Sequence, residues 1–314
     1  AAPAILATST LDGDKDGQID QILVTLSETI TDGSSTLDNT TFTVAGYTVS
    51  GTSTGSANDN QVLISLTESG SGDTDATPDV VLVTAKISDG TNALASDQTF
   101  TGTTDGAAPA IFAANTLDDD KDGQIDQILV TLSETITDGS STLDNTTFTV
   151  AGYTVSGTST GSANDNQVLI SLTESGSGDT DATPDVVLVT AKISDGTNAL
   201  ASDQTFTGTT DGAAPVFSAI TPSENSSVKF TNVGYTLSEA IAVGGSITYR
   251  RTGGSTDGSS PHAVSLSGSE LSSGVRSSSA LASAPTLTSG GIYMLEFNGT
   301  DLVGNVGTEV TVTG

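Results

Sequence analysis

The chain repeats itself with a period of 106 residues. Residues 1–106 (unit one) and 107–212 (unit two) differ at only four positions: Leu6/Phe112, Thr8/Ala114, Ser9/Asn115 and Gly13/Asp119. Residues 213–314 (unit three) begin with the same Ala-Ala-Pro and then diverge. Because about 100 residues is an ordinary domain size, the repeat predicts three tandem domains with these boundaries.

Short apolar runs separated by turn residues predict an all-β fold. Val, Ile and Leu alternate with polar residues, Gly, Asn, Asp and Ser lie between the runs, and no helical period is present. The seven strands expected in unit one lie at 3–8, 19–27, 40–45, 47–53, 61–67, 79–87 and 96–103. Strands and turns at this spacing are typical of a β-sandwich. We therefore expect three sandwiches of about seven strands each, joined into an extended rod.

One acidic stretch, residues 12–20 (the first loop), has the pattern of a calcium site and returns at 118–126 (the second loop). Acidic residues at positions 1, 3 and 5 and a glycine at position 6 let side chains converge on one hard cation, and residue 7 gives a backbone carbonyl. The predicted Ca²⁺ ligands are Asp12, Asp14, Asp16, Gln18 and Asp20, and Asp118, Asp120, Asp122, Gln124 and Asp126. Position 12 holds leucine, not the glutamate of an EF-hand, and a strand follows. A solvated acidic turn without metal is the alternative.

The net charge of −30, with only eight Lys and Arg, restricts the partners. Nucleic acid and anionic membranes attract basic surfaces, so we expect neither, and cations are the expected partners. Adaptation to a saline habitat is a second, compatible interpretation. The chain has no cysteine and no apolar run near the ~20 residues that span a bilayer. Since it starts at Ala1 without Met, we expect a processed protein or a piece of a longer one.

The joints between units carry the sequence Thr-Thr-Asp-Gly-Ala-Ala-Pro, at 103–109 (the first joint) and 209–215 (the second joint). The strand order places the first loop, the acidic stretch 73–79 and Asp105 at the end that faces the next unit. The turns with Glu28, Asp32, Asp89 and Asn92 lie at the opposite end. Each joint then brings two acidic ends together, which repel each other unless cations bridge them.

Unit three is nearly neutral, with 7 Asp and Glu against four Lys and Arg, whereas unit one has 15 against two Lys. Its stretch 223–229 has lost the acidic pattern. We therefore expect no calcium loop in unit three and a weaker response to cations at the second joint.

An Ala-Pro start, an Asp-rich loop before a strand that ends in Leu-Ser-Glu, and the turn Asp301-Leu302-Val303-Gly304-Asn305 resemble the immunoglobulin-like repeats of bacterial surface adhesins and surface layers. Units one and two have the shorter turns 89–92 and 195–198. This resemblance implies immunoglobulin-like sandwiches and a non-enzymatic, extracellular stalk at the cell surface, stiffened by calcium. Neighbouring repeats or copies of the chain are the implied partners, with cell-surface or host glycans or proteins as adhesive targets.

Two other functions stay open at this point. The first is a self-assembling subunit of a surface layer or filament. The second is a carbohydrate-binding module, although no ligand face is evident. Catalysis is not expected, because the Gly-x-Ser-x-Gly pattern at 51–55 lacks the strand-to-helix turn and a nearby histidine. His262 is expected at the surface.

Two further patterns have ordinary interpretations. Lys86 and Lys192 are expected as solvated strand residues, with an isopeptide cross-link as the alternative. Sequons occur at Asn39, Asn145, Asn225 and Asn298, and a chain this rich in Ser and Thr produces them often by chance.

Overall fold

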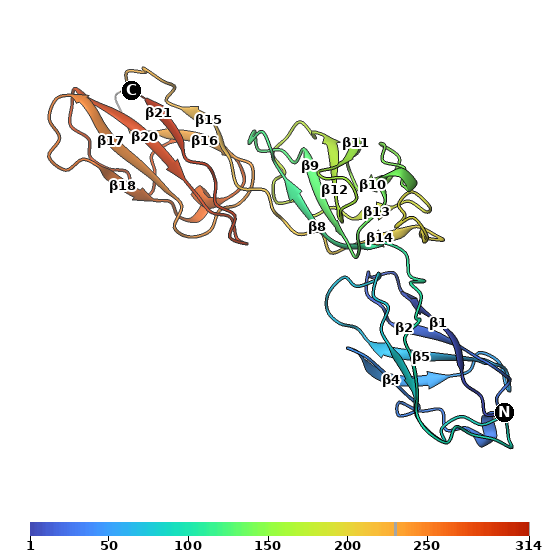
Figure 1. The fold of residues 1–314 in the computed structure, drawn as a ribbon. Coiled ribbons are helices and arrows are strands. Elements are labelled where there is room, and N and C mark those ends of the chain that lie inside the picture. The colour runs from blue at the N-terminus through green and yellow to red at the C-terminus, as the bar shows by residue number, and fades with distance from the viewer. Residues whose placement is uncertain (229–230, 314) are drawn as a thin grey trace.

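The computed structural model describes residues 1–228 and 231–313, and it is all-β. Three sandwiches follow one another end to end, and the line that they form bends between unit one and unit two (Figure 1). Among the described residues, no helix has the length and apolar character needed to cross a membrane.

Unit one consists of two antiparallel sheets. Its strands are β1 (Ile5–Leu11), β2 (Gln21–Leu26), β3 (Phe42–Val44), β4 (Thr48–Ser53), β5 (Gln61–Thr67), β6 (Val80–Leu82) and β7 (Gln98–Phe100). The first sheet has the order β1-β2-β5-β4 and the second β3-β6-β7. With the strands lettered A to G, these sheets are ABED and CFG, the arrangement of a constant-type immunoglobulin domain. A single 3-10 turn, η1 (Asp32–Ser34), lies between β2 and β3.

Unit two repeats this topology. Its strands are β8 (Ile111–Leu117), β9 (Gln127–Leu132), β10 (Phe148–Val150), β11 (Thr154–Thr160), β12 (Gln167–Thr173), β13 (Val186–Leu188) and β14 (Gln204–Phe206), with the 3-10 turn η2 (Asp138–Ser140). The sheets are β8-β9-β12-β11 and β10-β13-β14.

Unit three keeps seven strands but moves the fourth to the other sheet. Its strands are β15 (Phe217–Thr221), β16 (Val233–Leu237), β17 (Ser246–Gly254), β18 (His262–Ser265), β19 (Gly274–Ser279), β20 (Gly291–Asn298) and β21 (Val310–Thr313), with the 3-10 helix η3 (Gly268–Leu271). The sheets are β15-β16-β19 and β18-β17-β20-β21. The fourth strand, β18, forms a hairpin with β17 and leaves the sheet that contains β15.

Each unit has a hydrophobic core of its own. In β2, for example, Ile22, Val24 and Leu26 are buried and alternate with half-buried residues, because successive side chains of a strand point to opposite faces. Burying each such side chain contributes about 1.5–3 kcal/mol. The core of unit three also contains an aromatic cluster in which the Phe217 and Tyr235 rings meet edge to face at 5.3 Å.

In units one and two the chain leaves the sandwich along the first strand of the same unit. In unit one, the Thr104 amide donates to the Thr8 carbonyl and the Thr10 amide donates to the Thr104 carbonyl. These bonds form a parallel bridge between Ser9 and Thr104. Unit two repeats this bridge between Asn115 and Thr210. The first residues of each joint are therefore anchored to the preceding unit, and Asp105 and Asp211 follow directly.

Two side-chain predictions were wrong. The expected strand 79–87 ends at Leu82, so Lys86 lies in the following turn, where its Nζ pairs with Asp38 at 3.9 Å and contacts Thr40. His262 is only 16% exposed, because its Nε2 lies 2.8 Å from Asp257 Oδ2 and its ring packs near Tyr293.

Candidate metal sites

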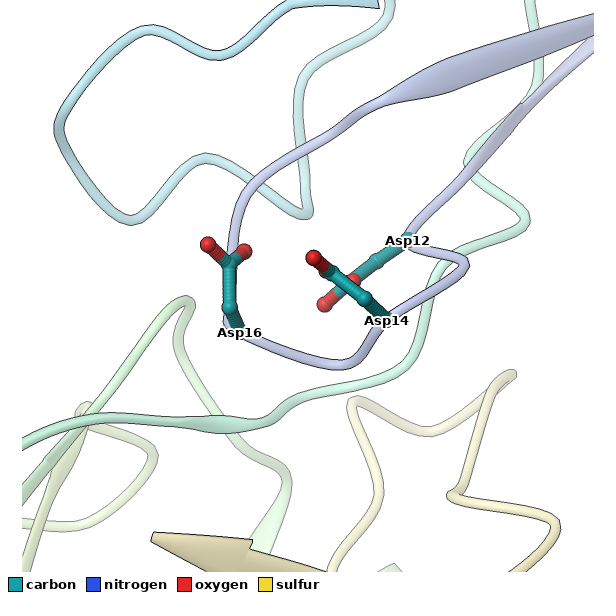
Figure 2. A group of neighbouring side chains, drawn as sticks. All are labelled: Asp12, Asp14 and Asp16. Atoms are coloured by element: carbon teal, nitrogen blue, oxygen red, sulfur yellow. The ribbon is translucent and has the colours of Figure 1, made fainter. Parts of the chain in front are cut away.

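The first loop brings three of its predicted ligands together. Asp12, Asp14 and Asp16 each have a carboxylate oxygen within 4.8 Å of the others, and Figure 2 shows all three inside the curve of the loop. The second loop groups Asp118, Asp120 and Asp122 in the same way. The spacing of alternate acids in the sequence therefore does lead to convergent carboxylates.

Backbone hydrogen bonds hold this loop in shape. Both oxygens of Asp12 accept backbone N–H groups, from Lys15 at 2.6 Å and from Gly17 at 2.9 Å. Lys15 and Gly17 have positive φ angles of 63° and 89°, which turn the chain sharply. Burial raises the pKa of Asp12 to about 6, and the nearby Asp16 and Asp14 charges add to this rise. A bound cation would oppose that rise, because a nearby positive charge favours the ionised carboxylate.

The structure places the other predicted ligands at the edge of the carboxylate groups. Asp20 accepts the Gly13 backbone N–H at 2.9 Å, and burial raises the pKa of Asp20. The Gln18 side chain donates to Asp16 at 2.9 Å and accepts from Gly70. Asp126 and Gln124 take the same positions in the second loop, where Asp126 accepts from Asp119 and Gln124 donates to Asp122. Their ligand roles stay predictions.

Sequence reasoning missed an acid beside each loop. Charge repulsion from Asp16, followed by burial and by repulsion from Asp14, raises the pKa of Glu68. Repulsion from Asp122 raises the pKa of Glu174 in the same way. Both glutamates directly follow the fifth strand of their unit, a position that the strand order places at the same end as the loop.

A second kind of carboxylate cluster lies at the joints. Asp105 of the first joint meets Glu134 and Asp195 of unit two, with one oxygen of each within 4.8 Å of the others (the first triad). Asp211, Glu239 and Asp301 form the same arrangement at the second joint (the second triad). In each triad the linker supplies one acid and two loops of the following unit supply the others.

The glutamate of each triad is deeply buried. Glu134 is 5% exposed and Glu239 is 2% exposed. Burial raises the pKa of Glu134 to about 8 and that of Glu239 to about 7. The Oε1 atom of Glu239 is buried and has no hydrogen-bond partner among the described residues. Leaving a buried charged group unpaired is costly, so this atom points to a missing positive partner.

The third acid of each triad organises a turn that also holds the linker. Asp301 Oδ1 accepts three successive backbone N–H groups, from Val303, Gly304 and Asn305, at 2.9, 2.5 and 2.8 Å. The Asn305 side chain then donates to the Asp211 carbonyl at 3.1 Å. Asn198 reaches the Asp105 carbonyl in the same manner, at 3.4 Å. The turn that carries the family resemblance is therefore part of the joint.

The linker acids are also poised for a cation. Burial, together with a hydrogen bond and charge repulsion from Asp195, raises the pKa of Asp105 to about 6. Burial and repulsion from Asp301 raise the pKa of Asp211 to about 6. Asp195 is partly buried, but hydrogen bonds from Asn198 and Thr197 outweigh this and lower its pKa. All six triad acids offer carboxylate oxygens, the donors that hard cations such as Ca²⁺ prefer.

The expectation for the ends of the units is confirmed, and the weaker cation response expected at the second joint stays a prediction. The first loop and Thr74 face unit two, as the strand order predicted, since Thr74 contacts Ser133 and Glu134. Although unit three carries little net charge, the second joint gathers a triad of three acids like that of the first joint. The loop-free stretch 223–229 ends at Lys229, which lies outside the described residues. Among the residues that are described, unit three contributes to one cluster of three acids, the second triad.

A scan against protein-family models and a search of curated protein sequences both return no match.

Proposed function

We propose that this chain is a non-enzymatic structural segment of an extracellular stalk, in which calcium ions hold neighbouring sandwiches in a fixed orientation. The observation that carries this proposal is the second triad. Glu239 is 2% exposed and its Oε1 has no partner among the described residues, while Asp211 of the linker and Asp301 lie against it. A divalent cation there would bind the linker to the following unit.

Calcium is the cation that the donor set supports best. Ca²⁺ takes 6–8 oxygen ligands in flexible geometry, and carboxylates, carbonyls and water supply them. The triads and loops contain neither histidine nor cysteine, which zinc sites favour. Extracellular calcium modules bind at about 10⁻⁴–10⁻³ M, so the sites would fill outside the cell.

Charge explains why such a joint would need its cation. Each triad brings three carboxylates together, and the chain as a whole carries −30. Without a cation, each triad lowers its repulsion by taking up protons or by moving its linker away. A stalk of this type would be stiff in calcium and would bend at its joints without calcium.

Small-angle scattering of the full chain tests this proposal. We expect a well-defined maximum dimension in calcium, and a broader distribution of shapes in chelator at low salt. The double variant Asp105→Asn, Asp211→Asn is the matched control, and its scattering should differ little between calcium and chelator. Identical scattering of the unaltered chain in both conditions, together with no calcium binding by calorimetry, would refute the proposal.

A surface-layer or filament subunit remains the second candidate because unit three exposes apolar side chains. Val243, Leu302, Val303 and Val306 are 92, 76, 69 and 72% exposed. The matching turn of unit one, 89–92, is polar. An apolar patch of this kind favours contact between copies. Electron microscopy in calcium separates the candidates, since a stalk segment gives isolated rods and an assembling subunit gives ordered polymers.

A further inference from the structure

The first loop is part of the interface with unit two. The carbonyl of Lys15, in the middle of the loop, accepts a hydrogen bond of 2.7 Å from the Gln204 side chain. Gly17 faces unit two so closely that a Cβ there would lie 3.0 Å from Ser133 Cβ. The shape of this loop therefore determines how unit two can dock.

Asp73 connects the loop to the next segment of unit one. Its Oδ1 accepts the Ile19 backbone N–H at 2.8 Å, and its own N–H donates to the Gly17 carbonyl at 3.2 Å. Its Oδ2 accepts the Tyr47 hydroxyl at 2.7 Å. Asp73 is thus tied to the last residues of the loop by its side chain and its backbone together.

Thr74, the next residue, reaches the first triad. Its side chain is fully buried, with 0% exposure. Its hydroxyl lies 2.6 Å from Ser133 Oγ and 2.8 Å from Glu134 Oε1. Ser133 Oγ in turn accepts the Ala110 backbone N–H at 3.0 Å, just after the linker. One side chain of unit one therefore contacts a triad acid of unit two and the serine that holds the linker.

The second joint repeats the same route. Ile125 donates to Asp179 Oδ1 at 2.8 Å, and the fully buried Thr180 lies 2.7 Å from Ser238 Oγ. Among the described residues, no hydrogen bond from Thr180 to Glu239 matches the 2.8 Å bond from Thr74 to Glu134, so Thr180 contacts the second joint through Ser238, the neighbour of Glu239. The route from the loop to the joint is thus shared, and the direct bond to the triad glutamate is present at the first joint.

We propose that each loop and the triad beyond it bind cations cooperatively, with Thr74 and Thr180 as the positioning residues that couple them. This inference rests on the proposed function, because it takes both clusters to be cation sites. A cation in the loop would order residues 17–19, which fix Asp73 and place the Thr74 hydroxyl against Glu134. When the triad binds its cation, Thr74 and Glu134 are then already in place, so triad binding costs less ordering. This gives positive coupling between the two sites.

The test uses the full chain with the second loop and second triad disabled by Asp120→Asn, Asp122→Asn and Asp211→Asn. Calcium titration by calorimetry then reports the first loop and the first triad alone. Adding Asp14→Asn and Asp16→Asn removes the loop site. We expect the calcium affinity of the triad to fall by about tenfold, within the usual range of coupling between sites. Because coupling is reciprocal, Asp105→Asn should lower the affinity of the loop by the same factor.

Thr74→Val tests the positioning role, since valine keeps the shape of threonine and lacks the hydroxyl. In this variant, removal of the loop site should change the affinity of the triad by less than about twofold, a small part of the usual coupling. Thr74→Ser, which keeps the hydroxyl, should restore the coupling. Thr43→Val, at an exposed position of β3, is the matched control and should leave it unchanged.

The outcomes separate this inference from the proposed function. Calcium binding at both sites with the same triad affinity, whether or not the loop is intact, overturns the coupling and leaves the stalk proposal standing. Coupling that persists in Thr74→Val overturns the role of the threonine. Absence of calcium binding at either site overturns the proposed function and the coupling together.

Discussion

Replacing Glu134 with glutamine should have opposite effects in metal-free protein and in calcium. Without a cation, burial raises the pKa of Glu134 from 4.5 to about 8. Between these two values the native state holds a proton that the unfolded chain has lost, so stability falls as the pH rises. Glu134→Gln removes this penalty, because glutamine carries no charge at any pH.

The magnitude follows from the same shift. At pH 7 the unfolded glutamate lies 2.5 pH units above its pKa of 4.5, while the native group is still largely protonated. At 1.36 kcal/mol per unit, the penalty is at most about 3 kcal/mol, and at pH 5 it is below about 1 kcal/mol. Opening of the first joint would expose the Glu134 carboxylate to water, which limits the stability that the unaltered chain loses at pH 7. In calcium at a thousand times the dissociation constant, the variant instead loses a ligand of a site that contributes about 4.1 kcal/mol, which exceeds this penalty.

Calorimetric unfolding of the full chain at pH 5 and pH 7, metal-free and in calcium, measures both signs. We expect Glu134→Gln to be more stable than the unaltered chain in metal-free protein at pH 7, nearly equal to it at pH 5, and less stable in calcium. Asp185→Asn, an exposed acid of the same unit, is the control and should show no such reversal. A variant that is less stable in metal-free protein at pH 7 would refute the reasoning.

Two further predictions concern the joints. Gly72→Ala should open the first joint at a cost of about 1–3 kcal/mol, because the new Cβ would lie 2.7 Å from the backbone Cα of Ser133. Small-angle scattering should show this opening. In the control Gly51→Ala the new Cβ has no atom within 4 Å, so the variant should keep the shape of the unaltered chain. Calcium binding at pH 7 should release up to about one proton per joint, because burial raises the pKa values of the triad glutamates. Calorimetry in buffers of different ionisation enthalpy counts the released protons. A count of zero at both joints would contradict the raised pKa values.

Local sequence patterns predicted the strands and the loops well. All seven strands expected in unit one are present, because alternation of apolar residues places one face of each strand in the core. The loops formed as expected, since Asp12 and its neighbours act over a few residues. Lys86 was misplaced because the apolar pattern continues to Ile87, which is buried in the core although it lies beyond β6.

The triads were not predictable as sites because their members are far apart in the sequence. Asp105 lies in a linker, Glu134 follows the second strand of unit two and Asp195 lies in a late turn. The sequence contained each part, in the two joint segments and in the Leu-Ser-Glu and Asp-to-Asn patterns, but only the packing of one unit on the next brings the parts together. Net charge has the same limit, since it counts the acids of a unit without showing where they lie.

The division of each triad between linker and following unit has a genetic consequence. The linker acid and the threonine lie at the trailing end of unit one, and the glutamate and the Asp-to-Asn turn lie at the leading end of unit two. Unit two carries both ends itself, in Asp211 with Thr180 and in Glu134 with Asp195. Recombination that duplicates or removes one 106-residue unit therefore leaves every junction with matching halves. The length of such an array can change in a single event, and no compensating substitution is needed.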